Sequence, residues 1–440
     1  MESIGIIVLR LILFFTILFL LYLLQRFWFL KVWRLAGRVR RPGWRRLLRV
    51  VWSLVLLAVF TPVFAWMVGL RLRILPRGSS AMALAGLWLS SAFLAYLAVK
   101  VVKAVEWLWS RWAGRRSEAG LGPATEWLES PSRRYFFQSA AYLAGAVPFV
   151  GALYGFAAER LRYRIERVEV PIPNLPAALD GLRIAQLSDI HIGGYMPREQ
   201  VRRAVDMANE FSAELAVVTG DFVTGASDPL EACVEELARL RAPLGVWGCN
   251  GNHEIYAGVE DYAEELFRQA GVRLLRGKNA EVVWRGQPFN LIGVDYQRER
   301  TPSGRRLPML PHVAPLVRRD LPNILLSHNP NVFPRAAALG IELALAGHTH
   351  GGQVQVEILH QRFSPARFFT EFVAGLYQRP AGAPSNSGRG SSGDTSSTDA
   401  GPRSPATSFL YVNRGLGTIA APVRINAPPE ITLLILRRAV

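Results

Sequence analysis

Five short motifs in the second half of the chain carry the residue types that metal sites use. They are Asp189-Ile190-His191, Gly220-Asp221, Gly251-Asn252-His253-Glu254, Ser327-His328-Asn329 and Gly347-His348-Thr349-His350-Gly351-Gly352. Alternate residues of an extended segment point to the same side, so Asp-x-His and His-x-His each present two side chains together. Imidazole, carboxylate and amide ligands without a thiolate suit Mn, Fe or Zn. The motifs therefore predict a site for one of these metals.

The number of candidate ligands indicates how many ions the site holds. The candidates are Asp189, His191, Asp221, Asn252, His328, His348 and His350. They are too many for one ion that keeps an open position. Two divalent ions about 3.5–4 Å apart, bridged by one carboxylate, use all of them, and the bridging hydroxide that such a pair generates can attack phosphorus in line. His253 remains as a general acid for the leaving group.

Each motif follows a short apolar run that is typical of a buried strand. The runs are Leu182–Leu187, Leu215–Thr219, Leu244–Cys249, Ile324–Ser327 and Ile341–Ala346, and a sixth, Phe289–Val294, has no such motif after it. Helical spacing in Pro197–Phe211 and Gly258–Gln269 separates some of them. This alternation predicts a layered α/β domain, in which the carboxyl ends of the strands meet at one crevice.

The last part of the chain contains further predicted strands, with one interruption between them. Gln353–Leu359, Phe409–Asn413 and Ile431–Leu436 are predicted as a second group of strands. Between them, Arg379–Ser408 consists mainly of Gly, Ser, Pro, Ala and Thr without periodicity. Such a segment buries too little apolar surface to order itself. We therefore predict a flexible insertion at 379–408 within a domain that covers residues 165–440.

The first third of the chain is predicted to be a unit of four transmembrane helices, residues 1–160. Four apolar runs are long enough to cross a bilayer, which takes about 20 helical residues. They are Ile4–Leu24, Val50–Leu70, Ala81–Val99 and Phe136–Ala157. We expect a multi-pass protein of the cell (inner or plasma) membrane.

The distribution of charge supports this interpretation and argues against nucleic-acid binding. The net charge of the chain is +17. Residues 1–164 carry 23 Lys and Arg against 6 Asp and Glu, which accounts for the whole excess. The second half is neutral, whereas a nucleic-acid groove would make the folded domain basic. With only two cysteines, Cys233 and Cys249, a disulfide scaffold is also excluded.

The basic residues also predict the orientation in the membrane. Nine of them follow the first apolar run, three follow the second and seven follow the third, from Lys100 to Arg134. Basic loops stay in the cytoplasm, so the predicted catalytic domain lies outside it. Ser132-Arg133-Arg134-Tyr135-Phe136-Phe137 resembles a twin-arginine export signal, with an ordinary positively charged flank as the alternative.

Taken together in this order, the five motifs resemble those of the calcineurin-like metallophosphoesterases. The extended Gly-His-Thr-His-Gly-Gly-Gln, with Gly375-Leu376-Tyr377, Asn413-Arg414-Gly415-Leu416-Gly417-Thr418 and Pro429-Glu430-Ile431, is similar to the membrane-associated bacterial branch. The resemblance covers about residues 165–440 and implies a four-layer α/β sandwich with two central mixed sheets. The four-span unit is not part of the common domain.

The resemblance also implies roles for the candidate residues. One metal would be held by Asp189, His191 and His350, the other by Asn252, His328 and His348, with Asp221 bridging them. His253 would be the acid or the group that stabilises the transition state. Glu254 stands where many relatives have Asp, and as it is not a ligand we expect no consequence.

The motifs predict the reaction better than the substrate, which could be a phosphomonoester, a phosphodiester or a pyrophosphate. Some relatives in this branch cleave UDP-2,3-diacylglucosamine, which suggests a lipid or cell-envelope substrate. That precursor is cytoplasmic, in conflict with the predicted orientation. The aromatic stretch Phe363–Phe372, with Phe368 and Phe369, is predicted as a core helix, with an acyl-chain contact as the alternative. Two other functions are a transporter or receptor with the phosphoesterase as sensor, and a metal-dependent hydrolase of non-phosphate bonds.

Overall fold

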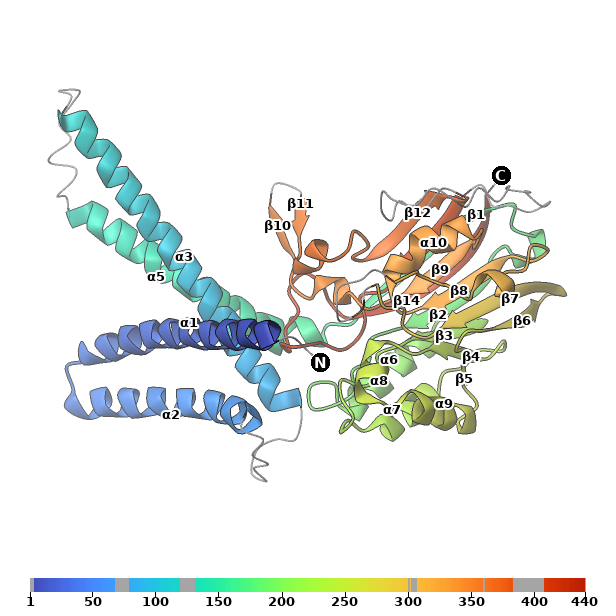
Figure 1. The fold of residues 1–440 in the computed structure, drawn as a ribbon, viewed down its shortest axis with the longest axis horizontal. Helices are drawn as coiled ribbons and strands as arrows, with labels where there is room; N and C mark the ends of the chain where they lie inside the picture. The colour runs from blue at the N-terminus through green and yellow to red at the C-terminus, as the bar shows by residue number, and fades with distance from the viewer. Residues whose placement is uncertain are drawn as a thin grey trace. The chain divides into compact units, whose positions relative to one another are not determined.

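The structure is a computed structural model, and it describes residues 4–67, 79–118, 131–299, 301, 307–358, 361–382 and 407–439. Contacts between Cα atoms divide the chain into two units. The first comprises Met1–Pro76 and Ala81–Tyr154, and the second comprises Arg77–Ser80 and Gly155–Val440. Figure 1 shows long helices in the first unit and strands with shorter helices in the second.

The described residues of the first unit are helical except for the turn at residues 38–41. Its helices are α1 (Ile4–Gly37), α2 (Pro42–Met67), α3 (Ser79–Glu118) and α5 (Pro131–Ala157). Aromatic side chains join three of them: the Trp28 indole N–H donates to the Ala92 carbonyl oxygen at 2.9 Å, and the Trp28 ring lies edge-on to Phe149 at 5.8 Å. The helices therefore pack through aromatic contacts.

Two helical segments among the described residues are long and apolar enough to cross a membrane. They are Leu84–Trp112 and Pro131–Leu161, and 28% and 11% of their most apolar windows are buried in the structure. An apolar helix in the core of a soluble domain would be mostly buried instead. The two segments overlap the third and fourth predicted spans. The first two spans stay predictions, and the loop that carries Arg71, Arg73 and Arg77 lies outside the described residues.

The second unit contains two six-stranded mixed sheets. The first has the order β1 (Arg164–Pro173), β14 (Glu430–Ala439), β2 (Arg183–Leu187), β3 (Leu215–Thr219), β4 (Val246–Cys249), β5 (Arg273–Leu274). The second has the order β12 (Gly375–Pro380), β13 (Thr407–Val412), β9 (Leu343–Ala346), β8 (Asn323–Ser327), β7 (Gln287–Val294), β6 (Lys278–Trp284). A separate hairpin joins β10 (Val356–Ile358) to β11 (Gln361–Phe363). The prediction of an α/β domain with two mixed sheets is confirmed.

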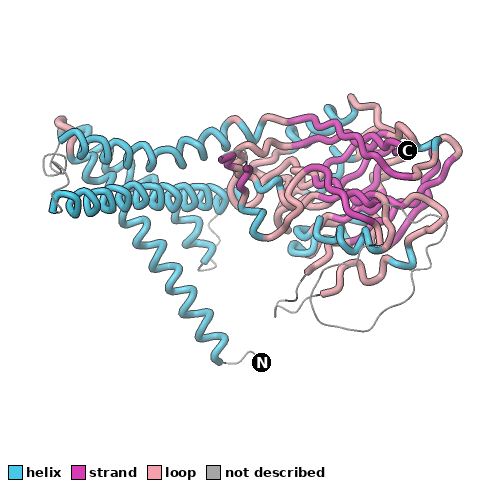
Figure 2. Tube along the Cα trace, turned by 90° about the horizontal axis from the view of Figure 1, so that it is seen from above, coloured by secondary structure: helices cyan, strands magenta, loops and turns pink. Residues whose placement is uncertain are grey.

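Helices cover the outer faces of both sheets (Figures 1 and 2). The helices are α6 (Arg198–Asn209), α7 (Leu230–Leu237), α8 (Asn252–Ala257), α9 (Glu260–Gln269) and α10 (Phe333–Ala338). Three-residue or four-residue 3₁₀ turns lie at Glu159–Leu161, Ala177–Leu179, Ala314–Leu316, Pro330–Val332, His350–Gly352 and Pro365–Phe368.

Three apolar cores separate four layers. The central core lies between the sheets and combines residues such as Val217 of β3 with Leu326 of β8. A second core joins α6, α7 and α9 to the first sheet, and a third joins α10 to the second sheet. Cys249 belongs to the central core and is fully buried. Each of the six predicted apolar runs overlaps a strand, because these strands are covered on both faces.

Two local predictions were wrong. Phe363–Phe372 is not a core helix: Phe363 ends β11, while Phe368 and Phe369 are 89% and 83% exposed. The predicted insertion was too long, because β12 extends to Pro380 and pairs with Thr407, at the start of β13. This pairing is made by backbone groups, which composition does not reveal. Residues 383–406 lie outside the described residues.

Candidate metal centre

The predicted site residues come from the carboxyl ends of strands in both sheets. Asp189 and His191 follow β2, Asp221 follows β3, and Asn252 and His253 follow β4, all in the first sheet. His328 follows β8, and His348 and His350 follow β9, in the second sheet. Backbone hydrogen bonds join successive loops, for example from the Asp189 N–H to the Gly220 carbonyl oxygen at 3.0 Å and from Gly347 to His328 at 3.1 Å. The two sheets therefore bring five loops to one place.

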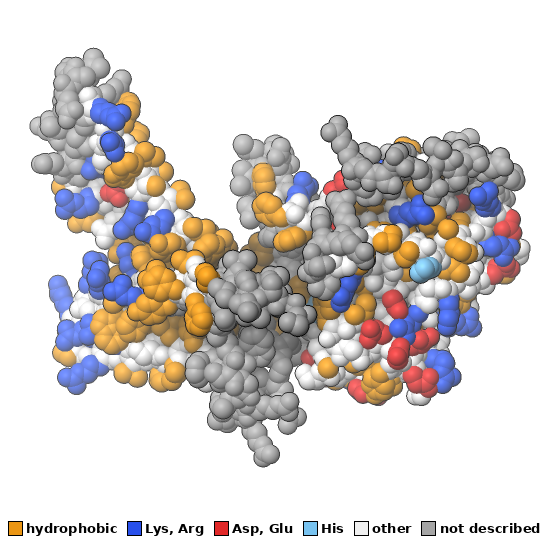
Figure 3. Space-filling view, in the orientation of Figure 1, with side chains coloured by type: hydrophobic (Ala, Val, Ile, Leu, Met, Phe, Trp, Pro, Cys, Tyr) orange, Lys and Arg blue, Asp and Glu red, His pale blue; other side chains and the backbone are white. Residues whose placement is uncertain are grey.

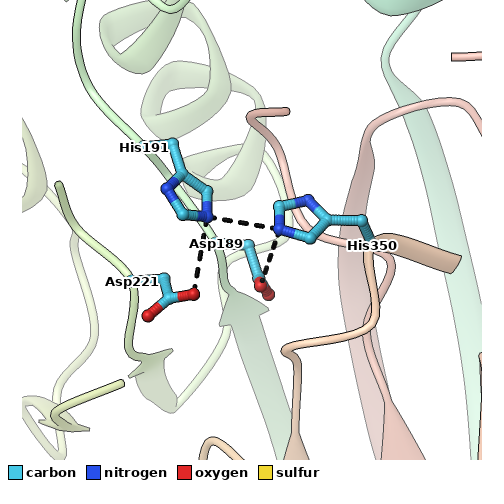
Figure 4. Close-up of side chains that lie close together, drawn as sticks. All are labelled: Asp189, His191, Asp221 and His350. Atoms are coloured by element: carbon cyan, nitrogen blue, oxygen red, sulfur yellow. Dashed lines mark hydrogen bonds and ion pairs between the residues drawn. The ribbon is translucent and has the colours of Figure 1, made fainter. Parts of the chain in front are cut away.

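Asp189, His191, Asp221 and His350 form the first cluster of candidate ligands, and one ligand atom of each lies within 4.8 Å of the others. Figure 4 shows His191 and His350 pointing toward each other above the two carboxylates. The two Nε2 atoms are 3.2 Å apart. His191 Nε2 lies 3.5 Å from Asp221 Oδ2, and His350 Nε2 lies 3.4 Å from Asp189 Oδ1. All four side chains are buried.

A second cluster shares one residue with the first. It consists of Asp221, His328 and His348. His328 Nε2 lies 3.0 Å from Asp221 Oδ2, the same oxygen that faces His191. Asp221 therefore lies between two groups of imidazoles, which is the position that a bridging carboxylate occupies.

Asn252 is buried as the first residue of α8. Its Oδ1 has no hydrogen-bond partner among the described residues. The N–H of the next residue, His253, donates to Asp221 Oδ1 at 2.9 Å, which connects this segment to the clusters. A buried amide oxygen without a partner is costly unless something else binds it.

The backbone at the site is strained. Asp189, His191, Asp221, His348 and His350 all have positive φ, between 47° and 75°. A residue with a side chain rarely adopts this region, and each instance costs of the order of 1–3 kcal/mol. Five of the seven candidate ligands are therefore held in conformations that the rest of the domain must stabilise.

Two glycines allow the loops to approach each other closely. A Cβ atom on Gly347 would lie 2.2 Å from Asp189 Oδ2, and one on Gly251 would lie 2.2 Å from Asp221 Oδ1. These distances are far below van der Waals contact, so any side chain at either position would displace a candidate ligand.

Burial and neighbouring charges shift the pKa values of the two carboxylates, Asp189 and Asp221, in opposite directions. Burial raises the pKa of Asp189. Burial acts the same way on Asp221, but the charges on and hydrogen bonds from His328 and His191 hold the pKa of Asp221 well below its usual value. Asp221 is therefore ionised at pH 7.

The pKa values of the imidazoles are also shifted in opposite directions. Burial disfavours a charged His328, but the carboxylates of Asp221 and Asp189 outweigh burial and raise its pKa to about 10. Burial and the charge of His328 lower the pKa of His348 to about 3. Burial and His191 hold the pKa of His350 well below its usual value. His348 and His350 are therefore neutral at pH 7, the form that binds metals.

His253 lies beside the clusters. Its ring centroid is 4.8 Å from that of His191, in an edge-on arrangement. Its Nδ1 lies 2.8 Å from the carbonyl oxygen of Thr224. A carbonyl oxygen only accepts, so Nδ1 carries a proton and the opposite nitrogen, Nε2, is left for a substrate.

Glu254 supports the site in a way that the sequence analysis did not anticipate. Its fully buried carboxylate accepts hydrogen bonds from the backbone N–H groups of Gly251 at 2.7 Å, Asp221 at 2.9 Å and Phe222 at 2.7 Å. Burial and the charge of Asp221 raise its pKa to about 7. Glu254 therefore joins two ligand-bearing loops, and the expectation that Glu in place of Asp has no consequence stays a prediction. The one local signal is its place three residues after Gly251, the pattern of a helix N-terminus.

Arg424 is a second residue that the sequence analysis missed. It is completely buried. Its guanidinium donates to the carbonyl oxygens of Ala427 at 2.8 Å, Arg414 at 2.9 Å and Gly415 at 3.0 Å, and it also contacts those of Gly417 and His350. The Gly415 segment packs directly on Asp189. Arg424 therefore fixes a loop that closes over the candidate ligands, and no motif signals it.

The loop after β7 adds an aromatic wall that the sequence analysis also missed. The Tyr296 ring centroid lies 5.3 Å from that of His348 and 6.2 Å from that of His328. Burial raises the pKa of Tyr296 above its usual value, so it is a neutral hydroxyl at pH 7.

The residues present fit a pair of divalent metal ions. The donor set contains buried carboxylates, imidazoles and an amide, arranged in two clusters that share Asp221. Ring nitrogens of His348 and His350 are buried without a hydrogen-bond partner among the described residues, as is Asn252 Oδ1. Unsatisfied buried groups directed into one site are expected where an ion binds. The identity of the metal does not follow from these contacts.

Comparisons with known proteins agree with this geometry. Residues 182–352 match the model of the calcineurin-like phosphoesterase family. The chain is 28% identical to a zebrafish (Danio rerio) transmembrane protein with metallophosphoesterase domain, over 68% of this chain and 62% of the relative. It is 28% identical to the uncharacterized metallophosphoesterase YkuE of Bacillus subtilis, over 70% of this chain and 99% of that protein.

A third relative is named for an activity. The phosphodiesterase YaeI of Escherichia coli is 26% identical, over 57% of this chain and 81% of that protein. The chain spans only 62% and 57% of the length of the zebrafish and bovine (Bos taurus) transmembrane relatives. The names of these relatives and the two apolar helices together suggest a membrane protein.

Proposed function

We propose, from the premise that residues 182–352 form a calcineurin-like phosphoesterase domain, that this chain hydrolyses a phosphoester at a site for two divalent metal ions. The observation that carries the proposal is the position of Asp221, whose carboxylate belongs to both candidate ligand clusters. A site with two clusters and one shared carboxylate is suited to in-line displacement at phosphorus.

The residues divide between the two ions as follows. Asp189, His191 and His350 would hold one ion, Asn252, His328 and His348 would hold the other, and Asp221 would contact both. Mn, Fe or Zn would supply an activated water and neutralise charge on the phosphoryl oxygens. The side chains themselves orient the substrate by their fixed positions, since the strained backbone and the buried loops leave them little freedom.

His253 completes the proposed site as the group that handles the leaving-group proton. Thr224 fixes the orientation of its ring through Nδ1, so Nε2 is the atom that meets the leaving oxygen. Burial lowers the pKa of His253, which keeps the ring largely neutral at pH 7 until a substrate with negative charge arrives. A positioned imidazole of this kind contributes about 10²–10⁴-fold to a rate.

We further propose that the chain is a multi-pass protein of the cell membrane and acts on a lipid or cell-envelope phosphoester. Exposed Phe368 and Phe369 favour a substrate with an acyl chain. The charge distribution of the first unit favours an extracytoplasmic catalytic unit. That placement makes a cytoplasmic nucleotide-linked lipid such as UDP-2,3-diacylglucosamine the less favoured substrate.

The test uses the full chain purified in detergent. We expect about two metal ions per chain, and Mn²⁺-dependent hydrolysis of p-nitrophenyl phosphate or bis-p-nitrophenyl phosphate that Asp221→Asn abolishes. Asp206→Asn, at a half-exposed carboxylate on α6, is the matched control and should keep both metal and activity. A folded protein without metal and without turnover on either ester would contradict the proposal.

A further inference from the structure

The first unit contains a cavity whose lining residues all belong to this unit. Its volume is about 580 Å³, and all four helices of the unit line it. A cavity of this size accommodates a small molecule or the polar part of a lipid. Nothing in the phosphoesterase chemistry uses it.

Basic side chains from three helices line this cavity. They are Lys31 of α1, Arg38 immediately after α1, Lys103 of α3 and Arg134 of α5. Glu106 is the only acid among the residues that line it, so the lining carries a net charge of +3. Among the described residues, none of the four cations forms an ion pair with a carboxylate. Lys31 instead lies over the Tyr142 ring, 5.3 Å from its centroid. The cavity therefore presents an excess of positive charge that Glu106 balances only in part.

The remaining wall is aromatic and apolar. It includes Trp28, Trp52, Trp88 and Phe149. The Trp28 and Trp88 indole N–H groups donate to Ala92 and Gln25. The Trp52 indole nitrogen is buried without a hydrogen-bond partner among the described residues. The tryptophans therefore face the cavity mainly as apolar rings.

The opposite face of α5 indicates what surrounds the cavity. Leu143, Val147, Val150 and Leu153 are each 65–69% exposed and recur at helical spacing. Tyr142, Gly145 and Phe149 of the same helix face the cavity instead. An exposed apolar face of this extent is typical of contact with lipid. In Figure 3, blue Lys and Arg side chains gather where α1 ends and α2 begins, and orange apolar side chains cover the middle of these helices.

We infer that this cavity binds one anionic phospholipid of the bilayer, with its phosphate among Lys31, Arg38, Lys103 and Arg134. Its glycerol and first acyl carbons lie against the tryptophans. Basic cavities between membrane helices at the cytoplasmic side recognise such headgroups. The inference rests on the proposed insertion in the membrane, but not on the proposed reaction.

The apolar wall decides between a lipid and a soluble phosphate. A free phosphate would gain from the cations but would leave the wall of Trp28, Trp52 and Phe149 without a partner. An anionic lipid satisfies both parts, because its headgroup carries negative charge and its chains are apolar. A zwitterionic lipid of equal size lacks the net negative charge that the net positive charge of the lining favours.

The experiment measures lipid bound to the full chain in detergent micelles, by native mass spectrometry, with phosphatidylglycerol and phosphatidylcholine as probes. We expect one phosphatidylglycerol per chain at concentrations where phosphatidylcholine does not bind. Lys31→Gln with Arg134→Gln should weaken phosphatidylglycerol binding at least tenfold. Arg41→Gln with Arg46→Gln removes the same charge from exposed positions outside the cavity and should change binding less than twofold.

Further variants separate binding from folding. Lys31→Arg keeps the charge and should bind as the native chain does. Trp52→Phe replaces the indole by a smaller aromatic ring, reduces the apolar wall and should weaken binding severalfold, with an unchanged far-ultraviolet circular dichroism spectrum. Millimolar inorganic phosphate should not displace the lipid.

Three results would overturn the inference. Equal binding of the two lipids would show that charge does not select the ligand. Equal loss in both double variants would place the lipid on the general basic surface. Displacement by inorganic phosphate would assign the cavity to a soluble anion. The number of metal ions and the hydrolysis of soluble esters should be the same in all these variants, so the two proposals fail separately.

Discussion

The side chain of Glu254 accepts a hydrogen bond from the backbone N–H of Asp221 at 2.9 Å, although the two residues follow different strands. Asp221 has a positive φ of 55°. Glu254 therefore stabilises the strained conformation of the residue that both ligand clusters share. It holds the loops of the candidate metal centre in place without belonging to either ligand cluster.

This relationship predicts the effect of Glu254→Gln. A Gln side chain places an NH₂ group against N–H donors of Gly251, Asp221 or Phe222, so at least one donor loses its partner at a cost of about 1–3 kcal/mol. We expect metal affinity to fall about 10–100-fold, as measured by titration against a chelator. Glu265→Gln, on the exposed side of α9, is the control. Unchanged affinity in Glu254→Gln would show that the loops keep their shape without the carboxylate.

His253→Gln should separate chemistry from metal binding. The ring is held by Thr224 and is not needed to complete either cluster. We expect kcat to fall about 10²–10⁴-fold while KM and the number of bound ions stay as in the native chain. Metal analysis and steady-state kinetics on one preparation provide the measurement. Loss of metal to the extent seen with Asp221→Asn would instead make His253 a ligand.

Arg424→Met tests the loop that closes over the candidate ligands. The substitution removes hydrogen bonds to carbonyl oxygens of Arg414, Gly415 and Ala427 and leaves them buried. We expect a loss of about 3 kcal/mol or more of stability, seen as a lower Tm in detergent, and weaker metal binding because the loop rests on Asp189. Arg437→Met, at an exposed ion pair with Glu169, should leave both unchanged. A lower Tm with native metal affinity would limit Arg424 to a role in stability.

Glu236 predicts a dependence of stability on pH. Hydrogen bonds from Arg202, and then from Arg198 and Arg239, lower its pKa from 4.5 to about 2. Because the folded pKa is depressed, the contribution is complete above pH 4.5 and is lost as the pH falls toward 2. The shift corresponds to at most about 3 kcal/mol, and solvent screening of the half-exposed arginines reduces it to about 1 kcal/mol.

The measurement compares Tm of the native chain and Glu236→Gln at several pH values. The native chain should be more stable at pH 6, and the difference should shrink by pH 3. Glu235→Gln, on the neighbouring exposed side chain, provides the comparison. A difference that does not change with pH would rule out the charge of Glu236 as its cause.

The candidate ligands could be predicted from the sequence because each follows a run of apolar residues that forms a buried strand. Strand ends of a layered α/β domain meet at one edge, so residue type and order were sufficient. Glu254 and Arg424 could not be found in this way. Their partners are backbone groups of distant or irregular segments, for example Phe222 for Glu254, and no side-chain pattern records them. Tyr296 likewise follows β7, a strand end without a ligand motif.

Two strands, β1 and β12, could not be predicted from the sequence for a different physical reason. β1 alternates charged and apolar residues and pairs in parallel with β14, at the far end of the chain. β12 ends in Gln378-Arg379-Pro380 at the edge of its sheet, where polar side chains are exposed. Apolar content alone does not detect edge strands, since only part of their surface is buried. The same limit explains Phe368 and Phe369, whose apolar character favoured a buried helix.

Those two exposed phenylalanines provide a test of the lipid substrate. Phe368 and Phe369 lie at and just after the 3₁₀ turn Pro365–Phe368, and two adjacent exposed aromatic rings are unusual on a soluble surface. If they contact an acyl chain, Phe368→Ala with Phe369→Ala should lower activity on a micellar lipid phosphoester severalfold and spare bis-p-nitrophenyl phosphate. Val283→Ala removes an exposed apolar side chain from β6 and should affect neither substrate. Equal loss of activity on both substrates would mean that the pair supports the fold of the catalytic unit. Unchanged activity on both would show that Phe368 and Phe369 do not contact the acyl chain.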